Sequence, residues 1–122
     1  MESYLCRGCK VHVGFHFDYN SLEKKLVKKT EDLMQKYEVK RIICTGHSLG
    51  GSLSTINGIE FFLRYGTKYE VNVHNFGSPR VGDVDLAHFI DTKLKVHQRV
   101  VHYKDAAPHF PHEYYGYWHA AQ

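Results

Sequence analysis

The stretch Val39-Lys40-Arg41-Ile42-Ile43-Cys44-Thr45-Gly46-His47-Ser48-Leu49-Gly50-Gly51 decides the fold class of this chain. Its first seven residues form a short run rich in β-branched residues, which is typical of a buried strand. The glycine-rich end leads into a segment whose apolar residues fall at helical spacing and which stops at Gly66. A buried strand that passes directly into a helix predicts an α/β domain.

The same alternation of strands and helices extends to both sides of this stretch. Upstream, apolar residues from Leu22 to Tyr37 predict a helix, with Asn20 as its N-cap and Glu23 at capping-box spacing. Residues 11–17 alternate in part and predict a short strand or the approach to that helix. Downstream, the expected elements are a strand over 70–76, a helix over 83–94, a strand over 98–103 and a loop over 104–122. Strands that alternate with helices pair in parallel through crossover helices, so the prediction is a mostly parallel sheet.

The composition fits one domain and excludes several classes of protein. The 122 residues are 43% hydrophobic and 24% charged, as in an ordinary globular domain, which excludes a disordered tail, a collagen-like repeat and a disulfide-dense scaffold. The apolar runs are too short for a membrane-spanning helix. The net charge of +3 is spread along the chain, so no nucleic-acid partner is expected. Lysines between residues 24 and 29 predict a solvated helix face.

Cysteine and histidine pairs raise the question of metals and disulfides. Cys6-x-x-Cys9 is compatible with a redox pair, half of a zinc site or a disulfide. Cys44 lies in the predicted strand and is expected to be a small buried hydrophobe. His109-x-x-His112 has metal-like spacing but sits in a proline-flanked loop without an obvious third ligand. We therefore expect no metal and no cofactor.

The pattern Gly46-x-Ser48-x-Gly50, which includes His47, matches the nucleophile elbow of hydrolases. A serine hydroxyl attacks an acyl carbon only if it projects from the backbone into a cleft, and a tight strand-to-helix turn achieves this. The flanking glycines remove side chains that would clash in such a turn. The following helix offers free N–H groups and a favourable dipole, so the Leu49 N–H is the expected first donor of an oxyanion hole.

A serine is a poor nucleophile without a histidine base, and that histidine needs an orienting acid. In this kind of site the chain order is serine, acid, histidine. Asp105 follows the third predicted strand, where an acid should emerge, and His119 lies further along the same loop. The three other aspartates after Ser48 fall at the start of a predicted helix or within it. The rivals are His109 and His112 for the base, and Asp83, Asp85 and Asp91 for the acid.

Several segments together resemble the class 3 lipases, the fungal-type triacylglycerol lipase family of α/β-hydrolases. They are Val11-His12-Val13-Gly14-Phe15, Thr45 to Gly51, Asn75-Phe76-Gly77-Ser78-Pro79-Arg80-Val81-Gly82-Asp83, Val100 to Pro111, and Gly116-Tyr117-Trp118-His119. The resemblance implies a partial α/β-hydrolase domain over residues 1–122, matching the C-terminal half of the family domain. It makes Ser48 the nucleophile, Asp105 the acid and His119 the base, and it treats His47 and Gly82 as structural. Ala106 replaces the branched residue often seen after the acid.

The resemblance also implies a class of substrate and shows that part of the family domain has no counterpart in these residues. The implied activity is hydrolysis of acylglycerols or related lipid esters without a metal or cofactor. The resemblance also implies a lipid–water interface as a place where this activity occurs. The alternatives are an esterase for phospholipid or phenolic esters and a non-catalytic lipase-like remnant. The upstream strand, oxyanion loop and lid of the family have no counterpart before Val11, so a further segment or a partner chain is expected to complete the fold. Family members are often secreted, although no signal peptide is visible here.

Overall fold

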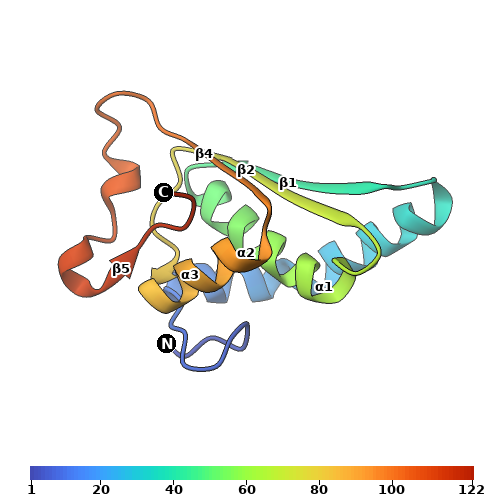
Figure 1. Ribbon diagram of the computed structural model, residues 1–122, viewed down its shortest axis with the longest axis horizontal. Coiled ribbons are helices and arrows are strands. Elements are labelled where there is room, and N and C mark those ends of the chain that lie inside the picture. Colours follow the sequence, from blue (N-terminus) through green and yellow to red (C-terminus); the bar gives the residue numbers. More distant parts are fainter.

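The computed structural model describes residues 1–122, and its three α-helices lie on one side of a three-stranded sheet (Figure 1). The main elements are α1 (Val13–Lys36), β1 (Arg41–His47), α2 (Leu49–Tyr65), β2 (Glu70–Phe76), β3 (Gly82–Asp83), α3 (Val84–Lys93), β4 (Val96–Val100) and β5 (Tyr117–Trp118). Two short 3-10 turns, η1 (Ala107–His109) and η2 (Glu113–Tyr115), lie in the last part of the chain. No helix combines the length and the apolar character that crossing a membrane needs.

The three long strands confirm the predicted parallel α/β arrangement. They lie in the order β1-β2-β4, and both pairings are parallel. A separate two-stranded antiparallel sheet joins β3 to β5. The parallel strands point the same way, so their carboxyl ends, and the loops that follow them, meet at one edge. The segments after His47, Phe76 and Val100 therefore lie together.

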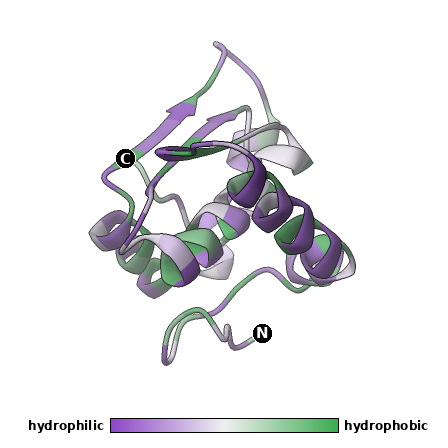
Figure 2. Cartoon of the chain, turned by 90° about the vertical axis from the view of Figure 1, so that its right-hand side faces the viewer, coloured by the Kyte–Doolittle hydropathy of each residue, from purple (hydrophilic) through white to green (hydrophobic).

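The core lies between the sheet and the helices. Period-two alternation turns Ile42 and Cys44 of β1 and Val73 of β2 toward the helices, where all three are buried. Gly58 of α2 lets the helix approach the sheet, because a Cβ at this position would lie 2.2 Å from Val73 Cγ2. Figure 2 shows hydrophobic and hydrophilic stripes side by side on the helices, as expected for helices with one buried face.

The opposite face of the sheet and both of its outer edges are uncovered in this chain. Ile43, Phe76 and Val100 alternate with the buried residues and are 56%, 45% and 50% exposed. The edge of β1 that faces away from β2 has no strand partner. Next to it lies a groove between α1 and α2. Its lining includes Tyr19, Leu22, Leu26, Ile43, Cys44 and Leu53.

Three details differ from the sequence prediction. Asn20 is not an N-cap, because α1 already begins after His12, whose Nδ1 accepts a hydrogen bond from the Phe15 N–H. The third strand ends at Val100 instead of residue 103. The final segment is not all loop, since β5 pairs with β3.

The cysteines divide into a pair and a single thiol. Cys6 and Cys9 form a disulfide in the N-terminal loop, one of the three alternatives left open by the sequence. Cys44 is a free buried thiol, as predicted. Burial raises the pKa of this thiol to about 11.

Candidate active site

Ser48 occupies the sharp turn between β1 and α2. Its backbone has φ 53° and ψ −123°, a conformation that residues with a side chain rarely adopt. The Ser48 N–H donates to the Phe76 carbonyl at 2.9 Å, which ties the turn to the end of the neighbouring strand. The Ser48 side chain forms no capping hydrogen bond with α2, so its hydroxyl is not used to hold the helix.

The glycines around Ser48 have different physical roles. A Cβ on Gly46 would lie 2.1 Å from the Gly50 carbonyl oxygen, so only glycine permits this turn. A Cβ on Gly51 would lie 2.8 Å from Ser78 Cβ, which makes Gly51 a contact point between α2 and the following loop. A Cβ on Gly50 meets nothing within 4 Å. The expected steric need is therefore observed at Gly46 but not at Gly50.

The N-terminus of α2 supplies positive electrostatic potential beside Ser48. The first N–H groups of an α-helix, here including that of Leu49, have no intrahelical acceptor. No acidic side chain lies in the first turn of α2 to compete for them. The Leu49 N–H is therefore available to a developing negative charge, as an oxyanion hole requires.

Asp105 lies at the same edge of the sheet, on the loop that follows β4. Its Oδ1 accepts a hydrogen bond from the Ala107 N–H at 3.0 Å. Its Oδ2 lies 2.7 Å from the place that a Cβ on Gly77 would take, and His47 Nε2 lies 3.6 Å from that place. Gly77 has φ +59°, so both its backbone and this close approach require glycine. The structure thus brings Asp105 to the turn that follows β2, beside the neighbour of Ser48.

His119 is hydrogen-bonded to the backbone of Pro108. Its side chain is buried, and its Nε2 is 2.7 Å from the Pro108 carbonyl oxygen, so this nitrogen carries the proton and donates. Burial is the main cause that lowers the pKa of His119 to about 4, with Arg99 and Arg80 acting in the same direction. The imidazole is therefore neutral near pH 7. No hydrogen bond joins His119 to Ser48 or to Asp105, so the structure does not assemble the three predicted side chains.

The rival residues have their own places in the fold. Asp83 is the N-cap of α3, and its carboxylate accepts from the Leu86 N–H at 3.0 Å. His112 caps η2 by accepting from the Tyr114 N–H. His109 is exposed, and its carbonyl group binds Arg80. No group of three or more histidine, cysteine, aspartate or glutamate side chains is placed to hold a metal ion.

Arg80 is a buried residue whose contacts the sequence did not reveal. The residue is 7% exposed, and its side chain binds the carbonyl oxygens of His109 and Pro111 and the carboxylate of Glu113. The sequence pattern placed it only in a loop between Pro79 and Val81. A lone arginine next to a proline carries no local signal of burial, because its partners lie about thirty residues further along the chain.

A parallel sheet with crossover helices and a serine on a strained turn before a helix defines the α/β class of serine hydrolase folds. The sequence model of the family Lipase (class 3) matches residues 1–115. The chain therefore belongs to the class 3 lipase family.

Fungal lipases are similar to this chain in sequence. The lipase of Rhizomucor miehei is 31% identical over 117 residues, covering 94% of this chain and 32% of that protein. The secreted mono- and diacylglycerol lipase 2 of Gibberella zeae is 31% identical over 124 residues, covering 93% of this chain and 30% of that protein. The chain thus spans about a third of the length of these relatives.

Solved structures show the same similarity in the fold. Lipase II from Rhizopus niveus superposes with a TM-score of 0.92 at 27% identity, covering 98% of this chain and 46% of that chain. A triacylglycerol lipase whose catalytic centre is described as a serine protease triad superposes with a TM-score of 0.89 at 28% identity, covering 98% and 46%. The relatives therefore contain a large part that has no counterpart in these 122 residues.

Proposed function

We propose that this chain carries the nucleophile and the acid of a serine ester hydrolase that acts on acylglycerols or related lipid esters. The observation that carries the proposal is the position of Ser48, whose hydroxyl is left unbonded on a strained turn at the N-terminus of α2. A hydroxyl that does not cap its own helix is available for chemistry. Membership of the class 3 lipases and the names of the fungal relatives support the substrate class.

The reaction follows from the groups around Ser48. Ser48 Oγ attacks the ester carbonyl carbon while a histidine base takes its proton, and the Leu49 N–H binds the carbonyl oxygen as its charge develops. The same base then protonates the leaving alcohol. Water, deprotonated by the base, cleaves the acyl-enzyme and releases the acid. Asp105 orients the base, and the second oxyanion donor comes from outside these residues.

The base itself has two candidate sources. The assignment to His119 stays a prediction, and it requires the ring to leave the Pro108 carbonyl and turn toward Ser48. The second source is a histidine from a further segment or a partner chain. The hydrogen bond of His119 to Pro108 favours the second source, because Nε2 donates there and is not free to accept the Ser48 proton.

The uncovered edge of β1 supports the proposal that a further segment or a partner chain completes the domain. An unpaired strand edge beside an apolar groove accepts an additional strand. Ile43→Lys tests whether this surface is free in the 122-residue chain. The expected change in the free energy of unfolding is within about 0.5 kcal/mol, the usual range for surface substitutions. A much larger loss, or a change of oligomeric state, would show that the chain already buries this surface.

Labelling with a fluorophosphonate tests the role of Ser48. The reagent forms a covalent bond only with a serine activated by its base, so wild type should be labelled and Ser48→Ala should not when the base is present, whether as His119 or as a histidine of the further segment or partner chain. Ser21→Ala is the matched control, because Ser21 is an exposed serine on α1 far along the chain from the turn. Equal labelling of wild type and Ser48→Ala would remove Ser48 from the mechanism. A cooperative melting transition without labelling or ester hydrolysis, both in the 122 residues and with the further segment or partner chain present, would favour the non-catalytic remnant.

A further inference from the structure

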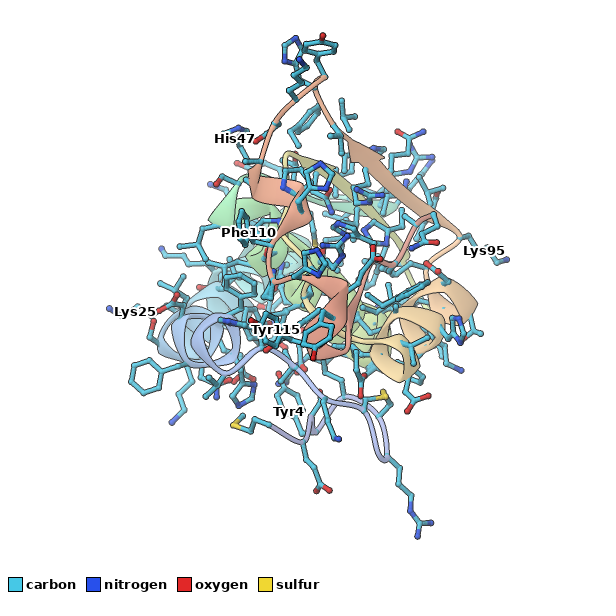
Figure 3. All side chains as sticks on the ribbon, turned by 90° about the vertical axis from the view of Figure 1, so that its left-hand side faces the viewer. Tyr4, Lys25, His47, Lys95, Phe110 and Tyr115 are labelled. Carbon is cyan, nitrogen blue, oxygen red and sulfur yellow. A yellow bond between two sulfur atoms is a disulfide. The ribbon has the colours of Figure 1, made fainter.

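The segment from Asp105 to Glu113 is held by side chains that come from outside it. It contains η1, a 3-10 turn of three residues, which has little intrinsic stability. Figure 3 shows this segment running between the labelled His47 and Tyr115, with Phe110 on the same side of the molecule. Its main-chain carbonyl groups receive hydrogen bonds from two distant side chains, those of Arg80 and His119.

Arg80 binds the far half of the segment. Its Nη1 donates to the His109 carbonyl at 2.6 Å and to the Pro111 carbonyl at 3.1 Å. Its Nη2 donates to Glu113 Oε1, and its backbone N–H donates to the Phe110 carbonyl at 2.8 Å. The planar guanidinium fixes several acceptors at once in a set geometry. Because Arg80 is 7% exposed, water does not compete well for these bonds.

His119 binds the near half. Its Nε2–H donates to the Pro108 carbonyl at 2.7 Å, and both Pro108 and His119 are buried. Pro108 follows Ala107, whose N–H in turn donates to the Asp105 carboxylate. The path from His119 to Asp105 thus runs through the hydrogen bond to the Pro108 carbonyl, the backbone between Pro108 and Ala107, and the hydrogen bond from the Ala107 N–H to Asp105 Oδ1.

From these contacts we infer that Arg80 and His119 are positioning residues, which hold Asp105 beside Gly77 by binding the carbonyl groups of Pro108, His109 and Pro111. This inference rests on the proposed function for the role of Asp105. It gives His119 a structural task as a neutral donor, in place of the proton transfer predicted from the sequence. An error of about 1 Å in the position of a catalytic group can cost a hundredfold in rate, so such support affects catalysis as well as stability.

Two substitutions of His119 separate positioning from proton transfer. His119→Gln keeps an N–H donor on a side chain that can reach the Pro108 carbonyl, but an amide cannot act as a general base. His119→Ala removes both properties. His97→Gln is the matched control, because His97 is partly buried nearby and its Nε2 bonds to Asn75 rather than to the 105–113 segment.

The first measurement is hydrogen exchange of the Ala107, His109 and Phe110 amides in the 122-residue chain. Each of these N–H groups is bonded within the segment. His119→Ala and Arg80→Gln should speed their exchange at least about tenfold, while His119→Gln and His97→Gln should leave it within a factor of about three. Unchanged exchange in both His119→Ala and Arg80→Gln overturns the inference. This measurement needs no activity, so it tests whether Arg80 and His119 hold the 105–113 segment even if the proposed function fails.

The second measurement is hydrolysis of a short-chain ester by the chain together with the further segment or partner chain that supplies the base. Positioning predicts a loss mainly in kcat for His119→Ala and Arg80→Gln, partial recovery in Arg80→Lys, and recovery in His119→Gln to within about tenfold of wild type. Equal losses of a thousandfold or more in His119→Ala and His119→Gln, with exchange unchanged in His119→Gln, would make His119 the base and overturn the inference. Failure of the proposed function has a different signature, namely hydrolysis that survives Ser48→Ala.

Discussion

Replacing Gly46 with alanine tests the steric account of the turn at Ser48. The new Cβ would lie 2.1 Å from the Gly50 carbonyl oxygen and 2.3 Å from its carbon, and these are backbone atoms that a rotamer change cannot move. Overpacking of this kind costs about 3 kcal/mol, at the upper end of the range for a well-packed core. With an m-value of about 2 kcal/mol per molar urea, the midpoint of unfolding should fall by about 1.5 M.

Gly50→Ala is the matched control within the same motif. Nothing lies within 4 Å of its Cβ position, and the residue is in the first turn of α2. Alanine in a helix is more favourable than glycine by about 0.5–1 kcal/mol, so the midpoint should rise slightly. Urea titrations followed by far-UV circular dichroism give both values. If Gly46→Ala is as stable as wild type, or if Gly50→Ala loses as much stability as Gly46→Ala, the steric reasoning is refuted.

Three further predictions follow from burial and cross-linking. Because burial raises the pKa of Cys44 to about 11, its thiol should react with a disulfide reagent at pH 8 only after unfolding; rapid reaction of the native chain would contradict this. Burial lowers the pKa of His97 and His119 from 6.5 to about 4 in the folded chain. At pH values between these two, the unfolded chain therefore binds more protons than the folded chain. The free energy of unfolding should therefore fall as the pH drops from about 6.5 to 4, and a slope unchanged in His97→Gln would exclude His97 as a cause. Replacing Cys6 and Cys9 with serine removes the short disulfide loop and should lower the free energy of unfolding by about 2 kcal/mol. A thermal melt measures this change, and an unchanged melting temperature would contradict it.

The sequence predicts most elements of this fold because their signals are local. The strand over 70–76 and the end of the second helix at Gly66 agree with the structure. The helix expected over residues 83–94 is present, and Asp83 is its N-cap. In each case a β-branched run, a glycine stop or a side-chain cap lies within the element itself.

The errors arise where distant contacts decide the outcome. For residues 11–17 the sequence left open a short strand or the approach to the helix; Val11 forms an isolated bridge to the distant Gly82, and α1 begins at Val13. β4 ends at Val100 because its register pairs that residue with Phe76, after which Gly77 turns the neighbouring strand away. No pattern within residues 98–103 contains that information.

The candidate site divides in the same way. Ser48 and its strand-to-helix turn follow from a contiguous motif, and the structure places them as the motif requires. Asp105 follows from chain order, since the carboxyl ends of parallel strands share one edge. The partner of His119 could not be predicted from spacing, because the orientation of a loop histidine depends on which buried acceptor it meets, here the Pro108 carbonyl.

The backbone conformation of Ser48 also shows that the choice of residue at this position costs stability. At φ 53° and ψ −123° the backbone of a glycine would have a lower conformational energy than that of a serine, by roughly 1 kcal/mol or more. Selection for thermodynamic stability alone would therefore favour glycine at position 48. The serine at this position lowers the stability of the fold, and the proposed role of its hydroxyl as the nucleophile accounts for that cost.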